Sequence, residues 1–460
     1  MRAKLFNLLR SDPTIKSHSE EEDSIHNEPI SPMASPGYAS DLNPTSTATS
    51  PYYLSPWNPA AASPFAKSPW IHLPALSDVD TKTGLIYSLV REEGHVYSLA
   101  ASGDLLYTGS DSKNIRVWKN RREFAGFKSS SGLVKAIVIS GDKIFTGHQD
   151  GKIRIWKVSP KDPSVYRRVG SLPRLKDFLK SSINPSNYVE VRRHKNTVWI
   201  RHFDAVSCLS LDEGAGLLYS GSWDKTVKVW RVSDSKCLES IPAHDDAVNS
   251  VAAFDGMVFT GSADGTVKVW RREVGNGGAV RHVAVRTLLK EESAVTALAV
   301  AREAGVVYSG SSDGAVHHWD LRRRMEYGGV LRGHTMAVLC LAAAGSLVIS
   351  GSADKTLCVW RRGKEEGHVR VTVLAGHAGP IKCVAAEVEA EEREVARGPR
   401  WVVYSGSLDR SVKVWRVSEN GGQVIERTPP HVWGSVAGGH EWLRRSPMHL
   451  RGRQEGPRKA

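Results

Sequence analysis

The sequence has few cysteines and no long apolar run, and both absences limit what the chain can be. Its 460 residues include five cysteines, an odd number, and none belongs to a Cys-x-x-Cys pair. The amino terminus does not resemble a secretory signal, so we expect reduced thiols in an intracellular protein. No apolar run approaches the roughly 18 residues of a transmembrane helix, so we expect no membrane span.

Motifs for common enzyme chemistry are also absent. The sequence has no Walker loop, no Gly-x-Gly-x-x-Gly and no His-Glu-x-x-His. These patterns mark nucleotide phosphates, dinucleotides and catalytic zinc respectively. We therefore expect no enzyme activity, no cofactor and no metal site.

The sequence contains instead a twelve-residue string that recurs seven times without a gap. One copy is YSGSWDKTVKVW, from Tyr219 to Trp230. The Asp and the Lys or Gly after it favour a hairpin turn, because Asp bonds its own backbone and Gly accepts a positive φ. The alternating residues that follow have the period of a strand. The copies end at Trp118, Trp156, Trp230, Trp270, Trp319, Trp360 and Trp415.

The spacing of these tryptophans predicts the fold class. They are 38, 74, 40, 49, 41 and 55 residues apart, and a unit of roughly 40 residues with four short strands is typical of a propeller blade. One blade cannot bury both of its faces, so we predict an all-β protein with seven blades in a closed ring. The apolar run Gly84 to Val90 precedes the first inner strand. We expect it to form the outer strand of the seventh blade and close the ring.

Over about residues 84 to 418 the chain resembles the WD40 family. The resemblance implies that His, Ser or Thr, Asp and Trp form a hydrogen-bonded tetrad in a blade, which gives the buried indole and imidazole partners. Four blades carry all four residues. The expected tetrads are His202, Ser220, Asp224, Trp230; His244, Thr260, Asp264, Trp270; His334, Ser350, Asp354, Trp360; and His377, Ser405, Asp409, Trp415.

Three blades depart from the pattern, and we expect them to be weaker. Ser130 and Glu291 stand at the histidine positions of the second and fifth blades, and Ser112 stands at the aspartate position of the first. Because the histidines recur by blade and not as close ligands, we favour hydrogen bonding in the core over metal binding. The segment 310–314 matches Gly-x-Ser-x-Gly, but it lies within a repeated hairpin, so we interpret it as a turn.

The ends of the chain differ in composition from the repeats. Residues 1–82 hold 11 of the 22 prolines and 13 serines, which predicts a disordered tail. Residues 419–460 are basic, and we expect them to be disordered as well. Six Ser-Pro pairs in the first tail are candidate sites for proline-directed kinases. Their serines are Ser31, Ser35, Ser50, Ser55, Ser63 and Ser68.

A basic insertion separates the second and third repeats. Residues 157–201 contain eleven Lys or Arg against three acids, a net +8 of the chain's +13. We expect a helix around Leu175 to Ser181 and a hairpin within 188–201. The length would nearly fit an eighth blade, but no copy of the repeat lies inside, so we favour seven blades and an insertion. Either 165–171 or 197–201 could supply the outer strand of the second blade.

The insertion resembles that of one group within this family. The strings RRVGSLPRLKDFLKSSINPSNYVEVRR and IRHFDAVSCLSL are similar to plant Jingubang-type WD40 proteins. This resemblance implies a part in regulating pollen germination and tube growth, through contact with a transcription regulator. We expect the protein in the cytoplasm, the nucleus or both.

Candidate binding residues come from the rim and from the insertion. In propellers of this kind the residue before the turn aspartate tends to face the upper rim, and a large aromatic such as Trp223 can anchor a partner. The alternative is that Trp223 packs under the insertion. The cations two residues before the blade tryptophans, such as Lys228, are better explained as structural. The partner-binding candidates are Gln149, Trp223, Leu408, Arg167, Arg168, Arg192 and Arg193.

Two functions fit these features. The first is a monomeric protein-interaction scaffold that binds acidic or phosphorylated partner segments. The second is a nucleic-acid-binding module, which an isoelectric point near 9.5 favours. The absence of a nucleic-acid motif and the few aromatic residues among the basic ones favour the first.

Overall fold

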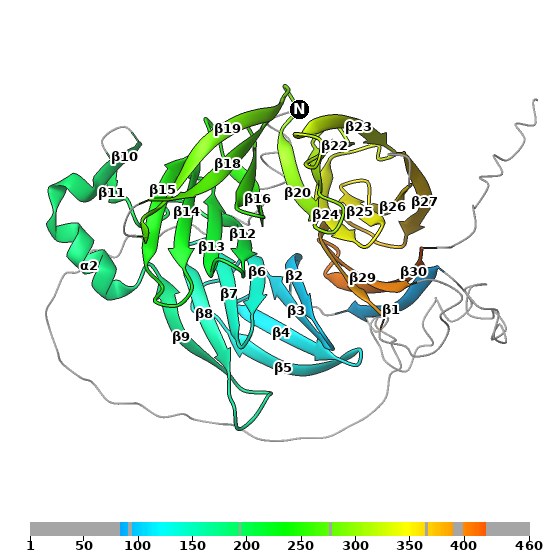
Figure 1. The fold of residues 1–460 in the computed structure, drawn as a ribbon. Helices are drawn as coiled ribbons and strands as arrows, with labels where there is room; N and C mark the ends of the chain where they lie inside the picture. Colours follow the sequence, from blue (N-terminus) through cyan, green and yellow to red (C-terminus); the bar gives the residue numbers. More distant parts are fainter. Residues whose placement is uncertain are drawn as a thin grey trace, which may run out of the picture. The chain divides into compact units, whose positions relative to one another are not determined.

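The computed structural model describes residues 83–90, 94–192, 195–275, 278–363, 367–389 and 399–419. Within these ranges the chain forms seven antiparallel four-stranded sheets, one separate hairpin and two short helices. Figure 1 shows the sheets as blades around a common axis. The tail predicted for residues 1–82, with its six Ser-Pro serines, lies outside the described residues. So does the tail predicted from residue 419, apart from Glu419 itself.

The first three blades follow the chain from inner to outer strand. Blade 1 is β2 (Val96–Ser102), β3 (Leu105–Ser110), β4 (Asn114–Lys119) and β5 (Arg122–Lys128). Blade 2 is β6 (Val134–Ser140), β7 (Lys143–His148), β8 (Ile153–Val158) and β9 (Tyr166–Leu172). Blade 3 is β12 (Val206–Asp212), β13 (Leu217–Ser222), β14 (Thr226–Arg231) and β15 (Cys237–Pro242).

The next three blades repeat this order. Blade 4 is β16 (Val248–Phe254), β17 (Met257–Ser262), β18 (Thr266–Val274) and β19 (Val280–Lys290). Blade 5 is β20 (Val295–Ala301), β21 (Val306–Ser311), β22 (Ala315–Asp320) and β23 (Glu326–Arg332). Blade 6 is β24 (Val338–Ala344), β25 (Leu347–Ser352), β26 (Thr356–Arg362) and β27 (His368–Ala375).

The two ends of the repeat region share blade 7. Its strands β28 (Ile381–Val388), β29 (Arg400–Ser407) and β30 (Ser411–Ser418) are completed by β1 (Gly84–Val90), which pairs antiparallel with β30. The inner strands contact one another in sequence, and β28 contacts β2. The ring of seven blades predicted from the repeat, and its closure by the leading strand, are therefore both present.

A glycine in the second strand of each blade allows the sheets to approach closely. A Cβ built on Gly261 would lie 2.5 Å from a Cγ1 of Val295, the first residue of the next inner strand. The same relation recurs around the ring and ends with Gly406 of blade 7 against Val96 of blade 1. The seven glycines are Gly109, Gly147, Gly221, Gly261, Gly310, Gly351 and Gly406. A side chain at these positions would force neighbouring sheets apart, which explains the small residue in every copy.

Hydrogen bonds also join neighbouring inner strands. The hydroxyl of Ser207 donates to the Val248 carbonyl, the Asn249 amide donates to Val295, and the Thr296 hydroxyl donates to Val338. Each donor follows the first residue of its inner strand. These contacts connect blades 3 to 6 in order.

The insertion contains the separate hairpin and the two helices. It includes α2 (Leu175–Ile183), the short 3₁₀ helix η3 (Pro185–Asn187), β10 (Tyr188–Arg192) and β11 (Lys195–Val198). The helix is two residues longer than expected, and the second strand of the hairpin ends at Val198. The strand β9 pairs with β8 and is the outer strand of blade 2, so the segment near 165–171 has this role and not 197–201. No copy of the blade string lies here, and β10–β11 is a two-stranded sheet, not an eighth blade.

Substitution of Gly261 by Ala should destabilise the ring. The added methyl would overlap the Val295 side chain, and overpacking of this kind costs about 1–3 kcal/mol. Urea unfolding of the full chain measures the change. The matched control is Gly84→Ala, since a Cβ there meets no atom within 4 Å. Equal midpoints for Gly261→Ala and the natural chain would contradict the close-approach argument.

Substitution of Leu89 by Ala should weaken the closure. Leu89 lies in β1, is 6% exposed and packs in a cluster with Val96, Leu106 and Val412. Removing a buried leucine side chain costs about 2–5 kcal/mol. Leu85 lies on the same strand but is 50% exposed, so Leu85→Ala should change the free energy of unfolding little. Similar losses for the two variants in urea unfolding would show that β1 does not seal the core.

Candidate partner-binding site

Four blades contain a continuous chain of side-chain hydrogen bonds. In blade 3 the Trp230 indole donates to the Ser220 hydroxyl over 2.9 Å, and Ser220 bonds the Nε2 of His202 over 2.8 Å. The Nδ1 of His202 lies 2.9 Å from the Asp224 carboxylate. These hydrogen bonds connect β14, β13, the loop before β12 and the β13–β14 turn. They therefore fix the loop that leads into the blade to the blade's central hairpin.

Blades 4, 6 and 7 have the same arrangement. The His–Asp distances are 2.9 Å for His244–Asp264, 2.9 Å for His334–Asp354 and 2.8 Å for His377–Asp409. The histidines bond Thr260, Ser350 and Ser405, which accept from Trp270, Trp360 and Trp415. The structure thus brings together all four groups of residues that the sequence singled out.

The geometry assigns each proton in the chain. The carboxylate can only accept, so the imidazole carries its proton on Nδ1 toward Asp224. In the neutral imidazole Nε2 is then an acceptor, and the Ser220 hydroxyl, which accepts from the indole, donates to it. Burial lowers the pKa of His202 despite the nearby Asp224. Burial alone would raise the pKa of the Asp264 carboxyl, but hydrogen bonds from His244 and Thr266 outweigh it and lower the pKa. All of these groups hydrogen-bond to one another within the blade, so they are not available to bind a substrate.

Blade 2 divides the role of the tetrad histidine between two side chains: the His148 imidazole bonds the Thr146 hydroxyl over 2.8 Å, and a guanidinium makes the contact to the turn aspartate. Arg154 is 3% exposed, forms an ion pair with Asp150 at 2.7 Å and donates from Nε and Nη2 to the Ser130 hydroxyl. Ser130 occupies the histidine position, so Arg154, which lies on β8, connects the same loop to the same turn. Trp156 still donates to Thr146 over 2.9 Å. The sequence showed that blade 2 lacks a histidine at position 130, but it did not show that Arg154 takes over the contact with the turn.

The series of side-chain hydrogen bonds is shorter in blades 1 and 5. In blade 1 the Ser112 hydroxyl accepts the Asn114 N–H at 3.1 Å, the turn contact that an aspartate makes elsewhere. In blade 5 the Ser309 hydroxyl is buried without a hydrogen-bond partner among the described residues. His317 in that blade bonds Tyr327 and lies 3.8 Å from Glu291, the residue at the histidine position.

The cations two residues before the blade tryptophans make contacts within the chain. Lys228 is 2% exposed, and its ammonium donates to the Trp199 carbonyl and the Ser240 hydroxyl. Lys268 donates to the Ala243 carbonyl, and Lys413 donates to Ser88 of the closing strand. Arg116 pairs with Glu123. These contacts agree with the structural interpretation of the series.

An aromatic cluster spans three blades at the end where the tetrad aspartates lie. The Lys135 ammonium lies 4.3 Å from the ring centroid of Trp223 and 5.4 Å from that of Tyr97. Trp223 is half-buried in the β13–β14 turn, and this contact comes from an inner strand and not from the insertion. Lys135 and Tyr97 were missed from the sequence. Both follow the first valine of an inner strand, and that shared register was the available signal.

The other two rim candidates occupy corresponding turns of other blades. Gln149 lies in the β7–β8 turn and Leu408 in the β29–β30 turn, and both are half-buried. The backbone of Gln149 donates to the Leu133 carbonyl, and the Leu408 carbonyl bonds the His95 ring. Trp223 is therefore the rim candidate with the largest side chain and an identified aromatic cluster.

The two described arginine side chains among the candidates lie on the outer strand of blade 2. Arg167 and Arg168 are exposed on β9, the outer edge of blade 2, and Arg168 donates to Ser130 over 3.3 Å. Arg193 lies outside the described residues. Arg192 ends the described part of β10, and its side chain is not among those described.

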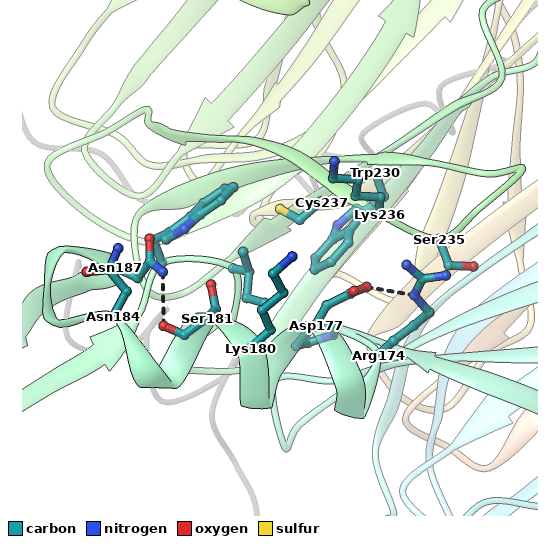
Figure 2. Close-up of a pocket in the computed structure, with 13 residues that line it drawn as sticks. Arg174, Asp177, Lys180, Ser181, Asn184, Asn187, Trp230, Ser235, Lys236 and Cys237 are labelled. Carbon is teal, nitrogen blue, oxygen red and sulfur yellow. Dashed lines mark hydrogen bonds and ion pairs between the residues drawn. The ribbon is translucent and has the colours of Figure 1, made fainter.

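A cavity of about 520 Å³ lies between the insertion and blade 3. Figure 2 shows Asp177, Lys180 and Ser181 of α2 facing Trp230 and Cys237 of the blade. Arg174 and Asp177 form an ion pair at 2.6 Å, and the Asn187 amide donates to the Ser181 carbonyl over 3.0 Å. The lining mixes polar and apolar side chains, and the insertion is held to the ring by Phe178, Val198 and Ile200 at its base.

All five cysteines are free and buried, and burial raises the pKa of Cys208 to about 12. Among the described residues no group of three or more His, Cys, Asp or Glu is placed to hold a metal ion. No helix in the described ranges has the length and apolarity needed to cross a bilayer.

A family model described as "WD domain, G-beta repeat" matches this chain in six segments. The segments are residues 85–119, 194–231, 235–271, 283–320, 325–361 and 368–416. They cover just over half of the sequence. The sheet of blade 2 lies between the first two segments, in agreement with its altered hydrogen-bond chain.

Curated proteins match over shorter regions. "WD repeat-containing protein pop1" of Schizosaccharomyces pombe is 30% identical over 205 residues, which are 39% of this chain and 26% of that protein. "Cell division control protein 4" of Saccharomyces cerevisiae is 25% identical over 239 residues, 51% of this chain and 24% of that protein. "Ribosome biogenesis protein BOP1 homolog" of Culex quinquefasciatus is 40% identical over 58 residues, 13% and 7% of the two chains. This chain thus spans about a quarter or less of each.

Substitution of Asp264 by Asn should lower stability in a pH-dependent way. Replacing a charged acceptor by a neutral one should cost about 1–2 kcal/mol at pH 7. The folded-state pKa of Asp264 is depressed, so its contribution is present above the unfolded pKa of about 4 and is lost as the pH falls toward the folded value. The gap between variant and natural chain should therefore shrink below about pH 4.

Urea unfolding at several pH values measures this gap. Asp245→Asn is the matched control, because Asp245 is exposed and adjoins His244 in the same loop. A gap for Asp264→Asn that stays constant from neutral to acid pH would show that the carboxylate charge does not stabilise the blade.

Proposed function

Because this chain belongs to the WD40-repeat family, we propose that it is a non-catalytic scaffold that binds a partner protein. WD40 propellers are generally scaffolds, and function in such folds resides in surface sites. The tetrad side chains are occupied by contacts within the blades. Partner recognition is therefore assigned to the Trp223 cluster and to the basic insertion.

The charge of the insertion defines the chemistry of the partner. Residues 157–201, which include β9 of blade 2 as well as the insertion, carry a net +8. Together with Arg167 and Arg168, which are exposed on β9, this charge favours a segment rich in carboxylates or phosphates. Trp223 adds a large aromatic surface, the kind of residue that dominates binding energy at interfaces. This charge is the observation that carries the proposal.

The resemblance to plant Jingubang-type proteins gives the proposal a biological setting. It supports a role in restraining pollen germination and tube growth through a transcription regulator. Such a partner fits a cytoplasmic or nuclear location, and the six Ser-Pro serines would offer a way to regulate contact by phosphorylation. We expect the propeller to act as a monomer.

Reversing two charges on β9 should abolish partner capture. The full chain, immobilised and incubated with pollen extract, should retain an acidic transcription regulator identified by mass spectrometry. Arg167→Glu with Arg168→Glu should lose it, because like charges would then face each other. The control is Lys128→Glu with Lys290→Glu, which changes the charge equally on exposed ends of β5 and β19. Equal capture by both double variants would place the binding surface elsewhere.

The proposed role in pollen germination needs a separate measurement. Pollen that lacks the protein should germinate earlier than normal pollen, and the natural chain should restore the delay. Failure of Arg167→Glu with Arg168→Glu to restore it would connect the surface to the role. Unchanged germination without the protein would remove the pollen setting but leave the scaffold function standing.

Nucleic-acid binding is the second candidate, and the net charge of the insertion is the observation that favours it. Filter binding across a range of salt concentrations separates the two functions. Sequence-insensitive binding with a steep salt dependence, lost on neutralising Arg167, Arg168, Arg192 and Arg193, would favour nucleic acid. Weak binding that these substitutions do not change would favour the protein partner.

A further inference from the structure

The helix α2 presents its polar face to the ring and its apolar face to solvent. Asp177, Lys180 and Ser181 line the cavity beside blade 3, as Figure 2 shows. A surface helix of a folded protein normally buries its apolar stripe. Here no residue of the helix is fully buried, although Phe178 packs partly against the core.

The outward face carries an uncovered apolar row. Leu175, Leu179 and Ile183 are spaced four residues apart and so lie on one side of the helix. They are 71%, 56% and 82% exposed. Water contact with three aligned aliphatic side chains is unfavourable, so the row is suited to contact with another molecule.

A basic row runs beside the apolar one. Lys176 and Lys180 each follow a leucine of the row and are exposed, and Lys180 stands at the edge of the helix where the outward face meets the cavity. The acid of the helix, Asp177, is on the cavity side and pairs with Arg174. The exposed face therefore combines aliphatic contact with positive charge along one edge.

We propose that this face docks an acidic amphipathic helix of a partner protein, a proposal that deepens and rests on the scaffold function above. Leucine or isoleucine side chains of the partner would pack between Leu175, Leu179 and Ile183. Glutamate or aspartate residues beside them would pair with Lys176 and Lys180. Rows spaced four residues apart interdigitate when two helices pack, which favours a helix as the occupant.

The same features disfavour two other occupants. A second copy of α2 would bring Lys176 and Lys180 close to like charges, which is repulsive. An anionic membrane would gain little, because the three side chains hold fewer aliphatic carbons than one myristoyl group, which itself binds bilayers only marginally. Charge and size together thus select an acidic protein segment.

A designed peptide tests the docking directly. The probe is a fluorescein-labelled helix with leucine every fourth residue on one face and glutamate beside it. Fluorescence anisotropy with the full chain should show binding, and a scrambled peptide of equal composition should bind about tenfold or more weakly. Leu179→Asp should weaken the probe about tenfold or more. Lys176→Glu with Lys180→Glu should do the same and flatten the salt dependence.

Val274→Asp is the matched control. Val274 is 68% exposed at the end of β18 in blade 4, so its substitution adds the same charge to a similar surface without changing probe binding. Thermal unfolding should be unchanged in both single variants, because Leu179 and Val274 are exposed.

Four outcomes would overturn the proposal. They are equal binding of the probe to Leu179→Asp, equal binding of the scrambled peptide, binding of phosphatidylserine vesicles but not of the probe, and self-association that Leu179→Asp abolishes in ultracentrifugation. Capture of the pollen partner by Leu179→Asp but not by Arg167→Glu with Arg168→Glu would reject this site alone. Capture by neither the natural chain nor any variant would reject the scaffold function itself.

Discussion

The close contact between one blade's glycine and the next blade's branched residue is the constraint on which the rest of the ring depends. It recurs at all seven interfaces, including the closing pair of Gly406 and Val96. Because the sheets meet at this distance, their inner strands can exchange hydrogen bonds, as between Ser207 and Val248. The apolar faces on both sides of each sheet are then buried without a further layer.

The side-chain hydrogen bonds inside the blades add a second constraint, because they hold the loops that lead into each sheet. In blade 3 they extend from Trp230 to Asp224 and fix the tautomer of His202. Blade 2 reaches the same end with Arg154 and Asp150. The requirement is thus a buried donor between the loop and the turn, and either imidazole or guanidinium meets it.

Function on this fold is expected at surfaces that the ring does not need for itself. The Trp223 cluster joins three blades, and the insertion is attached through buried Val198 and Ile200. Beyond that attachment α2 turns its leucines outward. An exposed apolar row on a helix that could have been rotated inward indicates an interface more clearly than net charge does, because charge alone is compatible with simple solvation.

The sequence by itself determined the number of blades and the four tetrads, because each depends on a repeated spacing that only one register satisfies. The apolar run before the first inner strand predicted the closing role of Gly84–Val90. It also contained the leucines of α2, but periodicity shows only that an apolar row exists and not which way it faces. The tertiary structure decided that orientation, the choice of β9 as the outer strand of blade 2, and the meeting of Tyr97, Lys135 and Trp223. These features depend on contacts between segments far apart in the chain. A local pattern such as the shared register of Tyr97 and Lys135 marks equivalent positions but does not specify which side chains meet.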